Sequence, residues 1–165
     1  MGRIRSRIWF DVFHISTDVM KASKMRIFLA EDNLGDVFLI EEALKRQSLE
    51  CDIDHYATAE EAIHAAELCG NTGAPVPDLM MLDYNLPRGN GSDILAAAGH
   101  NPKLASVPKV IVTSFLQADE LAQALELGAS CLITKPVDFE SFMRDVGAKI
   151  AELLRAGGIH QATKS

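Results

Sequence analysis

The chain has 165 residues, of which 48% are hydrophobic, enough to build one compact domain with a substantial core. Its longest apolar stretches fall well short of the roughly 20 residues of a membrane span, so a membrane-spanning protein is excluded. The formal net charge is −7, and residues 25–165 hold 11 basic and 21 acidic residues, a net −10. Such an acidic body argues against direct binding to nucleic acid.

From Met25 onward, short apolar runs alternate with longer stretches of helical period, which is the pattern of a parallel sheet covered by helices on both faces. The third and fourth runs are continuous in Met, Leu, Val and Ile, so we expect those strands to be central and buried on both faces. The sequence therefore predicts an α/β domain of five βα units. The strands are predicted at residues 26–30, 52–56, 78–82, 109–112 and 130–134.

Two helix starts and two helix ends carry recognisable signals. The side chain of Asn33 can cap the first helix. Thr58, followed three residues later by Glu61, resembles a capping box that opens a second helix, extending to residue 68. Glycine opposes helix continuation, so glycines mark the expected ends of the last two helices. These helices are predicted at residues 117–127, before Gly128, and 139–154, before Gly157 and Gly158.

The two ends of the chain lie outside this pattern. Met25 opens the first strand and is itself a plausible start, so we expect residues 1–24 to be a poorly ordered arm or a start artefact. The segment lacks the cleavage site of a secretory signal. We assign residues 25–156 to the domain and residues 157–165 to a flexible tail. The alternative for this leading segment is a docking helix, which its three aromatic residues would favour: Trp9, Phe10 and Phe13.

The three cysteines indicate a reducing compartment. They are odd in number, form no CxxC motif and lie in or beside apolar runs, which suits buried thiols in the cytosol. They are Cys51, Cys69 and Cys131.

Polar residues follow the ends of four predicted strands: Glu31 and Asp32 after the first, Asp83 after the third, Thr113 after the fourth and Lys135 after the fifth. The carboxyl ends of parallel strands meet at one edge of a sheet, so these side chains should converge. Adjacent carboxylates would repel by roughly 4 kcal/mol per pair at about 4 Å, a penalty that a bound cation removes. Oxygen ligands favour Mg²⁺, with Mn²⁺ as the alternative.

This edge suits phosphoryl chemistry. Asp83 can attack phosphorus as a nucleophile and form an acyl phosphate. Thr113 and Lys135 can each donate a hydrogen bond to an oxygen of the new group. Taken singly, an Asp after a strand is more often a helix cap, and Thr113 and Lys135 are ordinary strand and loop residues. Their joint occurrence, in this order and each at a strand end, favours the functional interpretation.

Over residues 25–155 the chain resembles the receiver domains of bacterial two-component response regulators. The resemblance rests on LAEDN, LMMLDYNLP, VIVTS and TKP, with intervals of 30 and 22 residues between Asp83, Thr113 and Lys135. It implies a flavodoxin-like, doubly wound sheet of order 2-1-3-4-5. It also implies that Glu31 and Asp32 are the acidic pair, Asp83 the phosphoacceptor, Thr113 the switch hydroxyl and Lys135 the conserved-type lysine.

The resemblance extends to neighbouring positions. Asn85 matches the residue whose backbone carbonyl completes the metal shell, and Pro87 and Gly91 match the turn that follows. The peptide bond between Lys135 and Pro136 matches a step that is often cis in the family. The implied metal ligands are Glu31, Asp32, Asp83 and Asn85.

Within the family, EDNLGDVFLIEEAL and KPVDFESFM are similar to small stand-alone regulators that partner bacterial phytochrome kinases. The resemblance implies that a sensor histidine kinase gives its phosphoryl group to Asp83 with Mg²⁺ required, that the acyl phosphate then hydrolyses slowly, and that the protein is a signalling protein rather than an enzyme. It also implies an output face on the last helices and fifth strand, where phosphorylation could favour a homodimer. Phe139 and Phe142 at the start of the last helix are more typical of core than of interface.

Two features depart from the family pattern. Leu132 stands where receivers commonly have Tyr or Phe, so a degenerate receiver acting as a scaffold stays an alternative. The loop at residues 70–77 is longer than in the shortest receivers, and we interpret it as a surface insertion.

Other classes are disfavoured by the residues present. Phosphatases and dehalogenases with an Asp nucleophile need an acid two residues later, where this chain has Asn85. A flavodoxin-like mononucleotide binder needs a Gly, Ser and Thr loop after its first strand, whereas AEDNLGD would repel phosphate. A histidine phosphotransfer domain is all helical, and the histidines share no motif: His14, His55, His64, His100 and His160.

Overall fold

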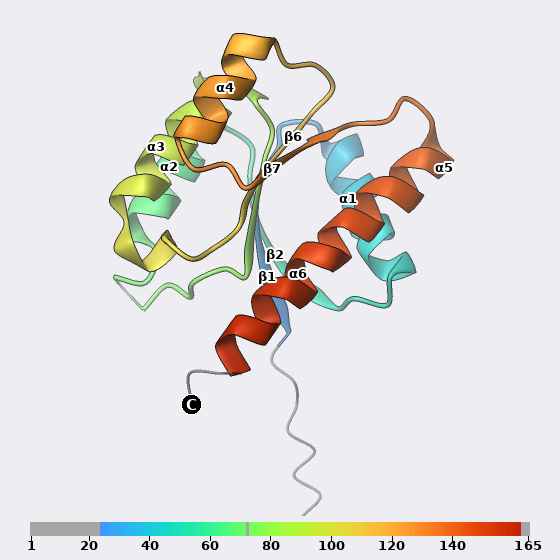
Figure 1. The fold of residues 1–165 in the computed structure, drawn as a ribbon, viewed down its shortest axis with the longest axis horizontal. Coiled ribbons are helices and arrows are strands. Elements are labelled where there is room, and N and C mark those ends of the chain that lie inside the picture. The colour runs from blue at the N-terminus through green and yellow to red at the C-terminus, as the bar shows by residue number, and fades with distance from the viewer. Residues whose placement is uncertain (1–23, 72, 163–165) are drawn as a thin grey trace, which may run out of the picture.

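The computed structural model of the protein describes residues 24–71 and 73–162. They form a central parallel sheet with helices on both faces (Figure 1). The sheet order is β2-β1-β3-β6-β7, which confirms the predicted order of the five strands. The strands are β1 (Met25–Ala30), β2 (Cys51–Tyr56), β3 (Leu79–Leu82), β6 (Lys109–Thr113) and β7 (Cys131–Thr134).

The helices divide between the two faces of the sheet. In Figure 1, α2, α3 and α4 cover one face, and α1, α5 and α6 cover the other. A 3₁₀ turn, η1 (Pro102–Leu104), precedes β6, and a π-helical stretch, η2 (Phe142–Val146), joins α5 to α6. The helices are α1 (Leu34–Arg46), α2 (Ala59–Leu68), α3 (Gly91–His100), α4 (Ala118–Glu126), α5 (Phe139–Ser141) and α6 (Gly147–Ala162).

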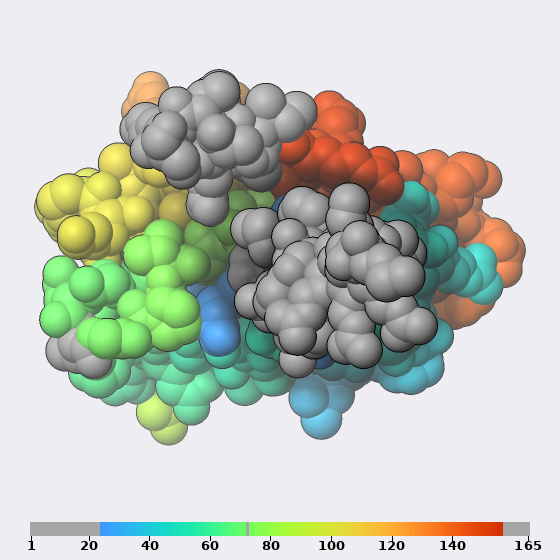
Figure 2. Space-filling model, turned by 90° about the horizontal axis from the view of Figure 1, so that it is seen from below, coloured from blue at the N-terminus to red at the C-terminus, as the bar shows by residue number. Residues whose placement is uncertain are grey.

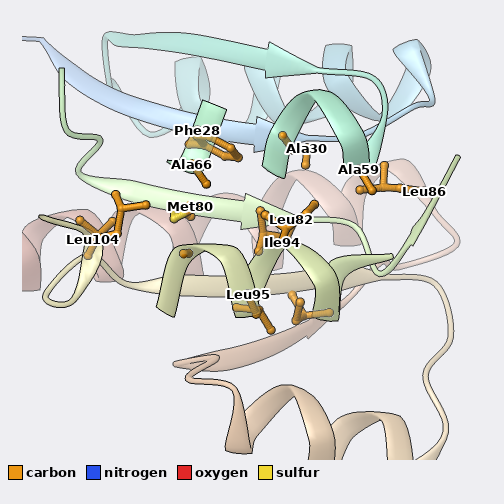
Figure 3. Packing of buried hydrophobic residues seen from close by; sticks show 14 of the residues in the cluster. Phe28, Ala30, Ala59, Ala66, Met80, Leu82, Leu86, Ile94, Leu95 and Leu104 are labelled. Carbon is orange, nitrogen blue, oxygen red and sulfur yellow. The ribbon is translucent and has the colours of Figure 1, made fainter. Parts of the chain in front are cut away.

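A hydrophobic core lies on each side of the sheet. Every residue of β3 and β6 is buried, as expected for central strands covered on both faces. Figure 3 shows the core beneath α2 and α3, where Phe28, Met80 and Leu82 of the sheet meet Ile94 and Leu95 of α3. Small alanines on α2 let that helix lie close to the sheet. The sheet is therefore packed against helices on both faces.

Two of the predicted caps are present. The Asn33 side chain accepts a hydrogen bond from the Gly35 N–H, and the Thr58 hydroxyl accepts one from the Glu61 N–H. The Glu61 carboxylate reaches past the cap residue to the Ala57 N–H, at 3.1 Å. The expected capping box is therefore only half formed, because Glu61 accepts from the Ala57 N–H and not from that of the cap residue Thr58.

Some predicted boundaries were wrong. The last helix does not end at Gly157 and Gly158, because α6 continues through them to Ala162. A glycine weakens a helix by only about 1 kcal/mol relative to alanine and does not forbid it. Gly128, by contrast, has φ of 96° and does follow α4. Except for Lys24, the predicted N-terminal extension lies outside the described residues.

The segment between β3 and β6 holds elements that the sequence interpretation did not locate. A small antiparallel hairpin pairs β4 (Asn85–Leu86) with β5 (Gly89–Asn90), and α3 follows at once. The signal was present in Asn90 and Asp93, which form a full capping box at the start of α3. The hairpin follows closely on Asp83 in the chain.

The loop predicted at residues 70–77 does connect α2 to β3. It lies at the end of the molecule opposite the polar edge, among the green residues in the view from below (Figure 2). Of the helices described, none is long and apolar enough to cross a membrane.

Candidate phosphoacceptor site

The five predicted residues meet at the carboxyl edge of the sheet. Glu31 and Asp32 follow β1, Asp83 follows β3, Thr113 ends β6 and Lys135 follows β7. Four of these five are buried, and Asp32 is exposed. Strand order alone explains the meeting, because β1, β3, β6 and β7 are neighbours in the parallel sheet.

Lys135 connects the carboxylates. Its Nζ donates to Glu31 Oε2 at 2.6 Å, to Asp83 Oδ2 at 2.6 Å and to Asp36 Oδ2 at 2.8 Å. The lysine side chain is only 6% exposed, so these ion pairs are shielded from solvent. An ammonium has three N–H groups, and three carboxylates accept them.

The site raises the pKa of both Lys135 and Glu31, but the dominant cause differs between the two groups. Burial lowers the pKa of Lys135, but the hydrogen bonds that its ammonium donates to Asp36, Asp83 and Glu31 outweigh burial and hold the pKa above its ordinary value. Burial raises the pKa of Glu31, and the hydrogen bond from Lys135 offsets part of that rise. Lys135 is therefore a permanent cation at neutral pH.

The acidic residues form a set suited to a hard divalent cation. Glu31, Asp32 and Asp83 each offer a carboxylate oxygen, and these atoms all lie within 4.8 Å of one another. One of the three, Asp32, faces solvent, and a cation with several waters fits such a half-open site. Oxygen donors fit Mg²⁺ or Mn²⁺ by their chemistry, whereas zinc sites in proteins commonly include nitrogen or sulfur ligands.

Asp83 and Thr113 are linked through Asn85. The Asn85 backbone N–H donates to Asp83 Oδ1 at 2.9 Å, and its side-chain Nδ2 donates to the Thr113 hydroxyl at 3.3 Å. Thr113 in turn donates to the Phe115 carbonyl at 3.1 Å. The structure thus brings Asn85 to the site, where its backbone N–H and its side-chain amide both donate hydrogen bonds.

Gly91 explains the turn after Asp83. A Cβ at this position would lie 3.0 Å from the Asp83 carbonyl oxygen and 3.1 Å from the Tyr84 Cα, so only glycine fits without displacing backbone. The bond before Pro136, at a step that is often cis in the family, is trans like the other peptide bonds of the described residues. Lys135 reaches the carboxylates from a trans peptide.

Sequence reasoning missed Asp36. It lies in the first turn of α1, where an acidic residue commonly serves only the helix terminus. The signal was a third carboxylate in EDNLGD, one helical turn beyond the acidic pair.

On the expected output face, the structure agrees with only part of the sequence prediction. Leu132 is half-buried and packs against the core beneath α2, α3 and α4. Of the two phenylalanines, Phe142 is buried, as expected, whereas Phe139 is 47% exposed and lies under the Arg46 guanidinium. Phe139 and the neighbouring Val137 leave apolar surface at the start of α5.

Residues 27–146 match the family model of the response regulator receiver domain, so the chain belongs to that family. It is a receiver-domain signalling protein of the two-component type, with the five-stranded fold of that family.

Among curated proteins it is similar to the response regulator Rcp1 of Synechocystis sp. strain PCC 6803, at 29% identity over 73% of this chain and 82% of Rcp1. Among solved structures it is similar to the phosphorylated cyanobacterial phytochrome response regulator RcpA, with a TM-score of 0.70 and 30% identity over 77% of this chain and 91% of that one. It is also similar to the Mn²⁺-bound form of Rcp1, with a TM-score of 0.67 and 28% identity over 75% of this chain and 90% of that one.

Proposed function

We propose that this protein accepts a phosphoryl group on Asp83 from a histidine kinase, in a reaction that requires Mg²⁺. The observation that carries the proposal is the triple ion pair of Lys135, which joins the Asp83 carboxylate to Glu31 at the edge where Asp32 and Thr113 also lie. A related regulator, RcpA, has been seen in its phosphorylated form.

Glu31, Asp32 and Asp83 are the proposed metal ligands, together with the backbone carbonyl of Asn85. A bound Mg²⁺ would supply charge neutralisation for the transferring phosphoryl oxygens. Mn²⁺ is the alternative cation, and the related Rcp1 has been crystallised with it.

The chain's own residues would carry the transfer. One carboxylate oxygen of Asp83 attacks the phosphorus of the phosphohistidine, a P–O bond forms, and the P–N bond breaks with its electrons going to the imidazole nitrogen. Lys135 offers an N–H to one phosphoryl oxygen and Thr113 its hydroxyl to another. Thr113 would have to release the Phe115 carbonyl to do so, and that exchange is our candidate for the conformational signal.

The same comparisons support a proposal for the partner and the setting. RcpA is a phytochrome response regulator, so we propose a sensor histidine kinase of phytochrome type as the phosphoryl donor. We propose a cytosolic protein with residues 25–156 as the receiver unit, acting as a signalling protein rather than an enzyme, without direct nucleic acid contacts. A phosphorylation-favoured homodimer through α5, α6 and β7 would use the exposed apolar side chains of Val137 and Phe139.

Intact-mass analysis after incubation with acetyl phosphate tests the proposal. We expect one phosphoryl adduct that requires Mg²⁺ and disappears in Asp83→Asn. The matched control is Asp93→Asn, which changes an acidic residue of α3 outside the site and should keep the adduct. No adduct on the wild-type protein would favour a scaffold instead.

A further inference from the structure

Four helices carry a carboxylate at their third residue, namely α1, α2, α3 and α4. At this position a carboxylate ordinarily turns back to accept a hydrogen bond from a backbone N–H at the helix start. Three of the four do so: Glu61 accepts from Ala57, Asp93 from Asn90 and Glu120 from Gln117, at 3.1, 2.9 and 2.8 Å.

Asp36 in α1 is the exception. The backbone N–H of its cap residue, Asn33, donates instead to Glu31 Oε1 at 3.1 Å. Asp36 turns away from the helix start, and its Oδ2 accepts from Lys135 Nζ at 2.8 Å, across 99 positions of sequence. Because Glu31 performs the capping, Asp36 is available for the lysine.

The three N–H groups of Lys135 indicate a role for its contact with Asp36. In the resting site its three N–H groups are shared among Glu31, Asp36 and Asp83. When Asp83 gains a phosphoryl group, one of these N–H groups must pass to a phosphoryl oxygen. Glu31 and Asp36 are the two partners that this reaction leaves chemically unchanged.

We propose that Asp36 is a positioning residue for phosphoryl transfer to Asp83. Together with Glu31 it anchors the Lys135 ammonium, so that the third N–H can pass from the Asp83 carboxylate to the incoming phosphoryl oxygen without the ammonium moving away. Asp36 acts through Lys135 and not through the cation. This inference rests on the proposed function of Asp83.

The test compares Asp36→Ala and Asp36→Asn with Asp93→Ala, which removes a carboxylate from the equivalent position of α3. The maximal rate of phosphorylation by acetyl phosphate is measured by intact mass at saturating Mg²⁺, and the Mg²⁺ dissociation constant and melting temperature are measured separately. We expect Asp36→Ala to lower the maximal rate about tenfold, because a mispositioned group costs rate rather than affinity. Its Mg²⁺ dissociation constant should stay within about twofold of wild type.

Asp36→Asn keeps an acceptor oxygen at the same place and should fall between Asp36→Ala and wild type, which makes it the deciding variant if Asp36→Ala does not fold. Asp93→Ala should lower the melting temperature, because it removes a helix cap, and leave the rate unchanged. An unchanged or faster rate in Asp36→Ala, or a rate loss that Asp93→Ala shares, would overturn the inference while Asp83 remained the acceptor. Absence of any adduct on the wild-type protein would overturn the proposed function itself.

Discussion

At the scale of single residues, the site is a problem of charge balance. Glu31, Asp36 and Asp83 surround one ammonium, and exposed Asp32 adds a fourth carboxylate nearby. Lys135 offsets one of these four negative charges. The remaining excess is what a divalent cation would reduce, and the phosphoryl chemistry proposed here depends on that reduction.

Lys109 is a second buried lysine, and it gives a pH-dependent prediction. Its Nζ donates to the carbonyls of Leu104 and Val107 at 2.6 and 2.9 Å, and burial lowers its pKa. Between the lowered pKa and the ordinary value near 10.5, the unfolded chain binds more protons than the folded one, so stability rises with pH. Below that window the effect of pH is flat.

We therefore expect the free energy of unfolding of the wild-type protein to increase relative to that of Lys109→Met as pH rises toward the ordinary lysine pKa of 10.5. The increase should be up to about 1.4 kcal/mol for each unit by which the pKa is lowered. Urea unfolding of both proteins at several pH values measures this difference. The two carbonyls left without a donor cost the variant a constant amount, which cancels in the slope. A difference that shrinks with rising pH would contradict the burial effect.

Most site residues were predictable from sequence because each follows an apolar run, and parallel strands bring such positions to one edge. Asp36 was not, because a carboxylate in a first turn has an ordinary local role and its distant lysine partner cannot be seen from the helix alone. The same holds for the Asn85 side chain, whose contact with Thr113 spans two strands.

At the scale of elements, the connection from β3 to α3 determines where Asp83 lies. Gly91 opens α3, and a Cβ added there would lie within 3.1 Å of the Asp83 and Tyr84 backbone. A Cβ added at Gly99, near the end of the same helix, would meet no neighbouring atom within 4 Å. The two glycines therefore differ in role although they share a helix.

Gly91→Ala should lower the free energy of unfolding by about 1–3 kcal/mol, since backbone must shift to admit the methyl group. Gly99→Ala should raise it by about 0.5–1 kcal/mol, because alanine favours the helix and meets nothing. Thermal or urea unfolding of the pair measures both. Equal effects of the two substitutions would show that close packing at Gly91 has no energetic weight.

The apolar pattern of the sequence predicted the five strands, but it did not predict where every helix ends. Gly128 and Gly157 look alike as helix stops, yet α4 ends shortly before Gly128, whereas α6 continues through Gly157. What separates them is backbone conformation, since Gly128 adopts a positive φ that the chain after α4 requires. Glycine in a sequence permits that turn without demanding it.

At the scale of the whole molecule, cation binding should be linked to folding. The unfolded chain separates Asp83 from the adjacent pair Glu31 and Asp32, so Mg²⁺ binds the folded state far better. At a free Mg²⁺ concentration 100 times the dissociation constant, the gain in stability should be about 2.7 kcal/mol. Melting curves with and without Mg²⁺ measure it.

Asp32→Asn should lose most of this gain and should be more stable than wild type without Mg²⁺, because one of the crowded carboxylates is gone. Asp93→Asn should keep the full gain. A Mg²⁺ effect that survives in Asp32→Asn would place the cation elsewhere on this acidic protein.

The most direct test of the account is to locate the phosphoryl group by chemical trapping. Borohydride reduces an acyl phosphate to the alcohol with release of phosphate, so a phosphorylated Asp becomes homoserine, which peptide mass mapping can place. After treatment with acetyl phosphate and Mg²⁺, we predict homoserine at position 83. Trapping at Asp32, Asp36 or another carboxylate, or no trapping at all, would contradict the assignment of Asp83 as the phosphoacceptor.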